Sequence, residues 1–370
     1  MKLRTSLILL FLILSASAAL GRTDKRSDKN RGSKVERTLA TDAHVTVSAC
    51  SVSGSITVHG WNRNEVRVRS SEAAEIKFQR KDEGADASPA KKIELLILDK
   101  EEAPEQPGFC ESSSEIELDV PRGATVQLRT RDSDISVFEV ANVYVNTQNG
   151  DVSIERATRT VEAGSIGGGI SLKDSTGRIN LHSAGGSIEA NEVRPAESGD
   201  TFEARSLGGE ITLDHVTHAQ LTANTLNGSL CVTGPLTHGG RYNFRTMSGD
   251  MTLTLPEDSS FQLSARFSQK AEIITDFPLT LMTQSNAHPT PAPNPAPMTS
   301  PVPPSGPTPQ PSPGPMSESP EVVTKVKSKN RTVVVDVSSL TLRRIEGIHG
   351  TGDAKLELAS FSGTIHLQKQ

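Results

Sequence analysis

Aromatic side chains are scarce in this sequence of 370 residues, because Phe, Trp and Tyr together make up only 4% of it. A core with so few rings must be built from Val, Ile, Leu and Ala. The chain also lacks an excess of positive charge, since 39 Lys and Arg stand against 44 Asp and Glu. This balance argues against a nucleic-acid-binding protein, which usually carries a basic surface.

Cysteine is also rare, and three residues exclude a fold held together by many disulfides. Cys50 and Cys110 lie in the N-terminal half and form the candidate disulfide if the chain reaches an oxidising compartment. The sequence leaves open whether these two cysteines pair. Cys231 lies between Leu230 and Val232, so we expect it to point outward as a lone thiol.

Long apolar runs are missing after the first residues of the chain. Residues 7–14 are apolar, follow the basic Lys2 and Arg4, and precede Ala16, Ser17 and Ala18. This order is typical of a secretory signal peptide, and the run is too short to cross a bilayer core of roughly 30 Å as a helix. We therefore predict an exported chain in the periplasm, at the cell surface or outside the cell. No transmembrane segment is expected after signal cleavage.

A repeated pattern fills the middle of the chain. Two alternating apolar residues lead to a Ser or Thr, then to a glycine position, then to two more alternating apolar residues. The alternation predicts short strands with one buried face, and the glycine predicts a turn with positive φ. The glycine positions, 17 to 23 residues apart, are Ser133, Gly150, Gly168, Gly186, Gly209, Gly228 and Gly249.

Two all-β architectures satisfy this repeat. In a β-solenoid, or β-helix-like stack, each coil has about 18–21 residues and coils stack about 4.8 Å apart. In an antiparallel meander, Asn149-Gly150 and Asn227-Gly228 would form two-residue hairpin turns. The near-constant repeat length favours the solenoid, in which stacked hydroxyl groups would bond to the turn backbone along the stack. The hydroxyl positions are Thr130, Thr147, Ser165, Ser183, Ser206, Thr225 and Thr246.

Composition divides the chain into six predicted segments. They are a signal peptide (1–18), a flexible charged lead-in (19–37), an N-terminal β cap (38–122), the β-repeat solenoid (123–287), a proline-rich segment (288–330) and C-terminal β-repeat strands (331–370). Proline donates no hydrogen bond to a sheet, so the proline-rich segment is expected to be a disordered insertion or linker.

Several short motifs resemble those of a known family. Residues 344–352, 355–358 and 362–365 resemble the terminal signature of the bacterial putative-adhesin family, and residues 54–58 with 60–62 resemble its opening. The resemblance covers roughly 40–287 and 331–370. This sequence departs from the family in its long proline-rich insertion and at His349, Gly350 and Thr351, where a denser glycine run is usual. The resemblance implies a β-solenoid-like fold and a role in the cell envelope, and it carries over no catalytic residue.

The residues that could carry chemistry form no catalytic or cofactor motif, so we expect neither an enzyme nor a cofactor. His215 and His218 lie three apart in strand-like sequence, which points them to opposite faces and makes a poor metal pair. Asp134 and Asp151 directly follow the glycine position in successive coils, where stacked carboxylates could bind a cation such as Ca²⁺. Because Gly169 and Ser187 interrupt this column, solvated turn aspartates are the simpler interpretation.

These observations favour an exported, non-catalytic β-repeat protein of the bacterial cell envelope that serves as an adhesion or scaffold module. Its partner would be an envelope component, a glycan or a matrix protein, bound along a flat outward strand face. A periplasmic module that senses or regulates envelope stress is the alternative hypothesis. A carbohydrate-active β-helix enzyme is a third hypothesis, and it would require clustered carboxylates on one outer face.

Overall fold

The computed structural model describes residues 34–71, 74–83, 88–99, 113–268, 271–282, 323–328, 331–336 and 342–370. The predicted signal peptide, most of the predicted lead-in and most of the proline-rich segment lie outside these ranges. Every named element within them is a β-strand. In the part of the chain that is described, no helix has the length and apolar character needed to cross a membrane.

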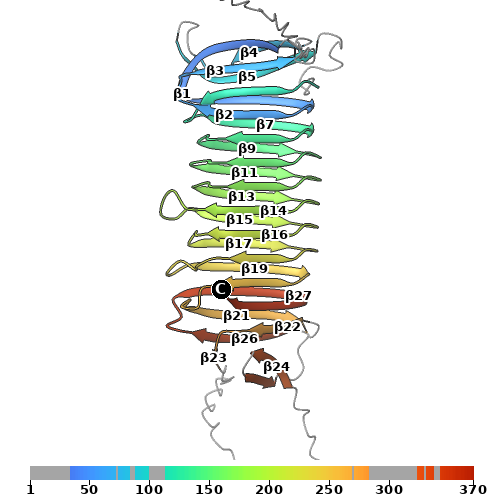
Figure 1. Cartoon of the computed structure of the whole chain (residues 1–370), viewed down its shortest axis with the longest axis vertical. Helices are drawn as coiled ribbons and strands as arrows, with labels where there is room; N and C mark the ends of the chain where they lie inside the picture. Colours follow the sequence, from blue (N-terminus) through green and yellow to red (C-terminus); the bar gives the residue numbers. More distant parts are fainter. Residues whose placement is uncertain are drawn as a thin grey trace, which may run out of the picture. The chain divides into compact units, whose positions relative to one another are not determined.

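The described residues wind into a β-solenoid made of two facing sheets (Figure 1). In each coil, a strand of sheet B is followed by a turn and a strand of sheet A. A second turn then leads to the sheet B strand of the next coil. Strands of successive coils pair in parallel within each sheet, as β9 does with β11 and β10 with β12. Parallel pairing excludes the antiparallel meander and confirms the predicted solenoid.

The strands of each sheet are defined by these bounds. Sheet A contains β2 (Ile56–Trp61), β3 (Glu65–Ser71), β6 (Ile116–Pro121), β8 (Ile135–Phe138), β10 (Val152–Glu155), β12 (Ile170–Lys173), β14 (Ile188–Val193), β16 (Ile211–Val216), β18 (Leu230–Thr233), β20 (Met251–Leu255), β22 (Ala271–Thr275), β24 (Val323–Ser328) and β25 (Arg331–Asp336). Sheet B contains β4 (Ala74–Arg80), β5 (Ala90–Asp99), β7 (Thr125–Asp132), β9 (Asn142–Thr147), β11 (Thr160–Ser165), β13 (Arg178–Ser183), β15 (Thr201–Ser206), β17 (Gln220–Thr225), β19 (Arg241–Ser248), β21 (Phe261–Ser268), β23 (Thr280–Leu281) and β26 (Leu342–His349). The long strands β1 (Lys34–Ser53) and β27 (Ala354–Lys369) contribute to both sheets.

The core lies between the two sheets and is continuous along the stack. Alternate residues of each strand point into it, as Val143, Val145 and Val161 do with almost no exposed surface. Burial of one such aliphatic side chain contributes about 1.5–3 kcal/mol. The alternation seen in the sequence therefore states which side of each strand faces the core.

The glycine position is required by a close approach of backbones in adjacent coils. A Cβ added to Gly186 would lie 2.0 Å from the carbonyl oxygen of Gly168, one coil away. The prediction of positive φ along this column was wrong for most of it. Among the predicted positions φ is positive only at Gly249, and in the coils of β1 and β27 the equivalent Gly54 and Gly363 also have positive φ. The glycines with no positive φ are Gly150, Gly168, Gly186, Gly209 and Gly228.

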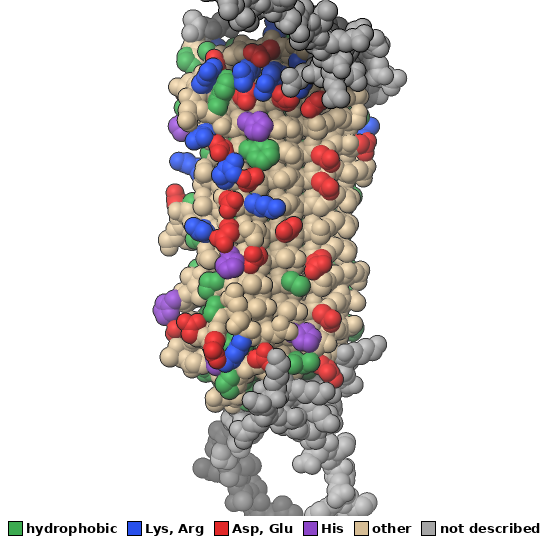
Figure 2. Space-filling model, viewed as in Figure 1, with side chains coloured by type: hydrophobic (Ala, Val, Ile, Leu, Met, Phe, Trp, Pro, Cys, Tyr) green, Lys and Arg blue, Asp and Glu red, His purple; other side chains and the backbone are tan. Residues whose placement is uncertain are grey.

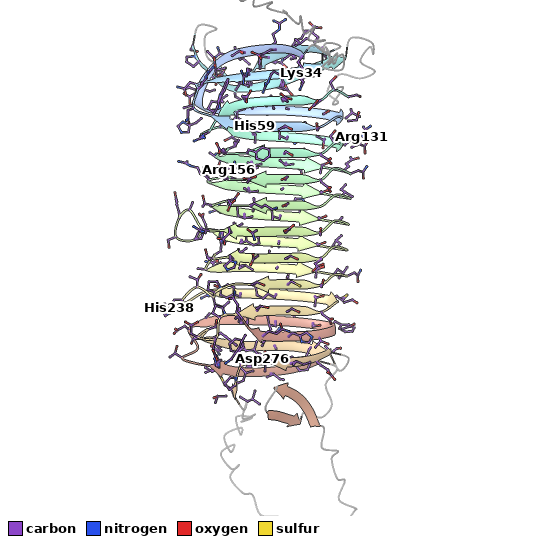
Figure 3. The ribbon with its side chains drawn as sticks, in the orientation of Figure 1. Lys34, His59, Arg131, Arg156, His238 and Asp276 are labelled. Carbon is purple, nitrogen blue, oxygen red and sulfur yellow. The ribbon has the colours of Figure 1, made fainter. Side chains whose placement is uncertain are left out.

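Positive φ occurs instead at the opposite turn, at non-glycine residues. These residues, each at the end of a sheet A strand, are Glu139, Arg156, Asp174, Glu192 and His215. The left-handed conformation costs a non-glycine residue roughly 1–2 kcal/mol. Figure 3 shows Arg156 at this edge of the stack and Arg131 at the other. We call the edge with the glycine column the glycine edge and the edge with Arg156 the charged edge.

The buried hydroxyl column bonds to the turn backbone, as predicted. Ser183 Oγ accepts the backbone N–H of Gly186 at 2.9 Å and donates to the carbonyl of Gly168 at 3.2 Å. The same pair of contacts occurs at Ser165 and Ser206. Each hydroxyl therefore closes its own turn and ties it to the turn of the neighbouring coil.

We expect Ser183→Ala to destabilise the protein by about 1–3 kcal/mol, because it leaves two buried backbone groups without their side-chain partner. The free energy of unfolding, measured by urea denaturation, reports the change. Ser187→Ala is the matched control, since Ser187 lies in the same turn but is exposed. Equal effects of the two substitutions would contradict this role of the hydroxyl.

Both ends of the stack depart from sequence order. At the N-terminal end, the coil of β1 and β2 lies between the coil of β5 and β6 and the coil of β7 and β8. The antiparallel strands β3 and β4 pair with β6 and β5. The region predicted as an N-terminal cap (38–122) thus adds coils to the stack as well as antiparallel strands.

At the C-terminal end, β27 forms a coil of its own that is inserted between earlier coils. Its first part pairs with β19 on one side and β21 on the other, and its second part pairs with β20 and β22. β26 pairs antiparallel with β21. The late repeat found in the sequence therefore lies inside the stack rather than at its end.

Two predicted boundaries differ from the structure. β1 begins at Lys34, inside the segment predicted as a lead-in, because residues 34–40 pair with β3. β24 lies inside the segment predicted as a proline-rich linker (288–330) and pairs with β25. The prolines end at Pro320, before β24 begins, so strand pairing is open to these residues.

Candidate functional site

A depression of about 390 Å³ lies on the outer side of sheet B, next to the glycine edge. The residues that line it, all of them described, belong to neighbouring coils: Ser51, Val52, Arg129, Thr130, Arg131, Asn146, Thr147, Gln148, Gly164, Ser165, Ile166 and His182. The outward-facing members that matter for chemistry stand in register, because Arg129 pairs with Asn146 and Gly164 lies between Asn146 and His182.

Gly164 is one of the residues that line this depression. It occupies an outward position of β11 where the neighbouring coils carry Asn146 and His182. A Cβ at Gly164 would lie 2.3 Å from His182 Nε2 and 2.8 Å from Asn146 Oδ1. These two side chains therefore lean over the glycine from both sides, and any larger residue would displace them.

The lining of the depression exposes mainly apolar atoms and includes the side chains of two arginines and two amides. Arg129 and Arg131 supply guanidinium groups, and Asn146 and Gln148 supply amides. No Asp or Glu is among its lining residues, all of which lie in described parts of the chain. Guanidinium groups bind carboxylates in a bidentate geometry, so the arrangement suits an anionic, hydroxyl-rich ligand.

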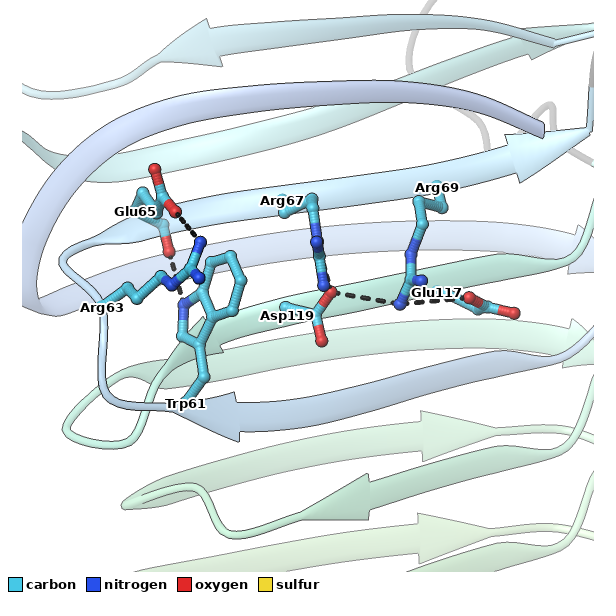
Figure 4. Close-up of polar contacts among 7 residues, drawn as sticks. All are labelled: Trp61, Arg63, Glu65, Arg67, Arg69, Glu117 and Asp119. Carbon is cyan, nitrogen blue, oxygen red and sulfur yellow. Dashed lines mark hydrogen bonds and ion pairs between the residues drawn. The ribbon is translucent and has the colours of Figure 1, made fainter.

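A second cluster of charge lies at the N-terminal end of sheet A (Figure 4). Trp61 donates its indole N–H to the Glu65 carbonyl at 2.8 Å, and Arg67 lies 4.8 Å from the centre of the Trp61 ring. Asp119 accepts hydrogen bonds from Arg67 at 2.8 Å and from Arg69 at 3.2 Å. The bond to Asp119 raises the pKa of Arg67. Because these arginines are engaged by a nearly buried carboxylate, the cluster fastens β3 to β6.

The outer side of sheet A carries other kinds of side chain than the depression on sheet B. Figure 2 shows this face, on which mixed charges gather at the N-terminal end and acidic side chains recur near the glycine edge. His59 lies on it (Figure 3) and stacks on Phe138 with ring centres 5.0 Å apart. The outward residues of β8, β10 and β12 nearest to the glycine edge are the serines Ser136, Ser153 and Ser171.

The two aspartates considered for a cation site cap the turns of adjacent coils. Asp134 Oδ1 accepts the backbone N–H of Asp151 at 2.9 Å, and Asp151 Oδ1 accepts that of Gly169 at 2.8 Å. Asp250 makes the same contact with the N–H of Thr364 at 2.7 Å. No group of three or more His, Cys, Asp or Glu side chains within the described ranges is arranged to hold a metal ion.

The cysteines lie in two different settings. Cys50 is disulfide-bonded and Cys231 is free. Cys110 lies outside the described residues, so its pairing with Cys50 stays a prediction. Cys231 points outward as expected but is half-buried, with its Sγ 3.6 Å from Glu210 Oε1. Burial, with a smaller effect of Glu210, raises the pKa of the Cys231 thiol, which makes it a weak nucleophile.

The two histidines that could have formed a metal pair differ in their exposure to solvent. His215 is half-exposed and lies 2.8 Å from Asp214, whereas His218 is fully buried. His218 Nε2 hydrogen-bonds to the carbonyl of Gly177 at 2.7 Å. Burial lowers the pKa of His218, so its imidazole is neutral at pH 7 and serves the packing of the core.

The depression was not predicted from the sequence, although the repeat holds a signal for it. The position before each buried hydroxyl points outward from sheet B. In successive coils it holds Arg129, Asn146, Gly164, His182, Arg205, Asn224 and Arg245. Gly164 is the residue of this column without a side chain, and it is not part of the glycine turns that the repeat identified.

Comparison with known proteins gives a family match. A family profile described as Toastrack DUF4097 matches residues 55–289. No curated protein matches the chain.

Solved structures are similar over part of the chain. One is described as a putative adhesin from Bacteroides fragilis, with 17% identity, 60% of this chain and 97% of that chain covered, and a TM-score of 0.39. Another, described as a putative adhesin from Parabacteroides merdae, has 9% identity, covers 61% and 90%, and has a TM-score of 0.37. A third is described as a putative lipid binding protein from Parabacteroides distasonis, with 14% identity, 61% and 91% covered, and a TM-score of 0.36.

Proposed function

Because the matched region spans more than half of the chain, this protein belongs to the Toastrack DUF4097 family, and from this premise we propose that it is a binding module. The proposed ligand is an acidic glycan held in the depression around Gly164. The observation that carries the proposal is the depression itself, which is lined by Arg129, Arg131 and His182, with no carboxylate among the lining residues.

The chemistry of the lining supports a carbohydrate of this class. Two guanidinium groups can hold sugar carboxylates, and the amides of Asn146 and Gln148 can bond to hydroxyl groups. The apolar side chain of Val52, which is partly exposed, would contact the face of a sugar ring. Repeated coils on either side give a long polymer a flat surface to follow.

The proposal includes an exported, non-catalytic protein of the bacterial envelope, in an adhesion or scaffold role. Export rests on the signal peptide predicted at residues 1–18. The non-catalytic role is supported by the use of Asp134 and Asp151, whose carboxylates accept backbone N–H groups of the next coil. A carboxylate held in this way is a poorer acid or base for glycosidic chemistry than one that faces a ligand.

We expect the protein to bind polygalacturonate or alginate but not neutral dextran, in biolayer interferometry at low and moderate salt. The double substitution Arg129→Ala and Arg131→Ala should weaken binding by at least about tenfold, because it removes both guanidinium groups. Loss of affinity at higher salt should be steeper for the parent protein than for the variant.

The control is the double substitution Arg178→Ala and Arg241→Ala. Both arginines are exposed on sheet B away from the depression, and their removal changes the net charge equally. Equal weakening of binding by the two double variants would mean that the overall charge of the protein, and not the depression, explains the binding. Release of unsaturated or reducing sugar ends would contradict the non-catalytic role.

A further inference from the structure

A line of exposed apolar side chains runs along the glycine edge. Its members, each 40–59% exposed, are Ile166, Leu207, Leu226, Met247 and Phe361. We call these five residues the apolar ridge. Each directly follows a buried hydroxyl, so all five take the same place at the apex of the turn.

The register of the coils makes this line continuous. Ser165 and Ser206 each pair with Ser183, and Ser206, Thr225, Thr246 and Ser360 then pair in order. The residues that follow these hydroxyls therefore stack one above another, with Ala184 between the first two members of the ridge. Five steps of about 4.8 Å give the ridge a length of about 24 Å. Aligned apolar side chains of this kind mark a contact surface rather than scattered exposure.

Charges of opposite sign flank the ridge on its two sides. On the sheet B side, Arg205 and Arg245 stand two residues before Leu207 and Met247. On the sheet A side, Glu210 and Asp250 stand three residues after them. All four charged side chains are exposed, and Arg205 also forms an ion pair with Glu203 of the same strand. The ridge therefore has a basic margin and an acidic margin.

The positive and the negative charges beside the ridge occur in the same coils. The coil of Leu207 carries both Arg205 and Glu210, and the coil of Met247 carries both Arg245 and Asp250. In the other ridge coils both places are neutral: Gly164 with Gly169, Asn224 with Ser229, and Ala359 with Thr364. A surface that repeats this pattern is complementary to itself.

We propose that a second copy of this chain covers the apolar ridge, in a dimer whose two-fold axis runs parallel to the stack. Rotation about this axis brings each ridge residue against its own copy at the same level. It also places the basic margin of one copy beside the acidic margin of the other, so that Arg205 faces Glu210 of the second copy and Arg245 faces Asp250. Such an isologous contact closes on itself and forms no fibre.

The other way to join the two edges is excluded by charge. A two-fold axis perpendicular to the sheets would place the acidic margins of both copies on the same side of the seam. Four carboxylates would then line one side of the seam and four arginines the other side. The repulsion between these like charges would weaken the dimer. The pattern therefore selects the parallel arrangement.

Charge reversal tests both the contact and its direction. Arg205→Glu alone should weaken the dimer by at least about tenfold in analytical ultracentrifugation, because each dimer then holds two like-charge contacts. Glu210→Arg alone should do the same. A mixture of the two variants should restore association to near the parent level, because both contacts between unlike copies are then attractive. Failure of the mixture to associate would overturn the proposal.

A cysteine substitution tests the level-by-level contact. In the parallel dimer, Leu207→Cys should form a disulfide with its own copy under mild oxidation, while Arg194→Cys at the charged edge should not. Leu207→Asp with Met247→Asp should yield a monomer with unchanged thermal stability, because both residues are exposed. A parent protein that stays monomeric at all concentrations, or that binds lipid vesicles through the ridge instead, would overturn the proposal.

Discussion

Gly209→Ala is expected to destabilise the protein by at least about 3 kcal/mol, an effect at the upper end for one added methyl group. The added Cβ would lie 2.0 Å from the carbonyl oxygen of Gly186 and 2.4 Å from its carbonyl carbon. These are backbone atoms in the next coil and cannot rotate away. The two coils must separate at this turn, which weakens the backbone hydrogen bonds between them.

Gly208→Ala is the control for this prediction. Gly208 is the preceding residue of the same turn, and a Cβ there would meet its nearest atom at 3.4 Å, an ordinary contact. Both variants lose the same backbone freedom in the unfolded chain, so their difference reports the close approach alone. Thermal unfolding followed by circular dichroism would measure it. A similar unfolding temperature for the two variants would show that adjacent turns are not in backbone contact.

Removal of residues 342–370 is expected to abolish the single cooperative unfolding transition. These residues include β27, which separates β19 from β21 and β20 from β22 along the stack. Without β27, both neighbouring coils expose unpaired strand edges and the end of the core opens. We expect limited proteolysis to cut the truncated chain within residues 256–282 while the earlier coils resist.

A single substitution tests the same role of β27 without removing the chain. Ile365 lies fully buried in the second part of β27, and Ile365→Ala should cost about 2–5 kcal/mol. Gln368→Ala, on the exposed side of the same strand segment, is the control. A truncated chain with parent-like stability and protease resistance would mean that β21 and β22 can pair directly with β19 and β20.

The repeat predicted the regular part of the fold well, for a physical reason. Alternation along the strands follows from a flat core between two sheets, and the hydroxyl before each glycine turn bonds to it as expected. The all-β solenoid and the resemblance to the putative-adhesin family are confirmed. A pattern that recurs in every coil is visible in one sequence because each coil repeats the same constraint.

The other features depend on contacts that a linear pattern does not contain. Glu139 and Arg156 adopt positive φ in turns where no glycine marks the need for it. The sequence likewise contains no sign that β27 enters the stack ahead of β21. The depression around Gly164 can be located only from the register between strands. That register shows that one outward position holds glycine, whereas the same position in the neighbouring coils holds a residue with a side chain.

The position of β27 has a consequence for the order of synthesis. β22 ends at Thr275, whereas β27 begins at Ala354. The ribosome therefore completes β22 well before it makes β27, the strand that must separate β22 from β20. At 5–20 residues per second, the gap lasts on the order of 4–16 s. During that time the edges of β19 and β20 are unpaired and open to wrong partners. Productive folding of this end therefore begins only after β27 has been synthesised.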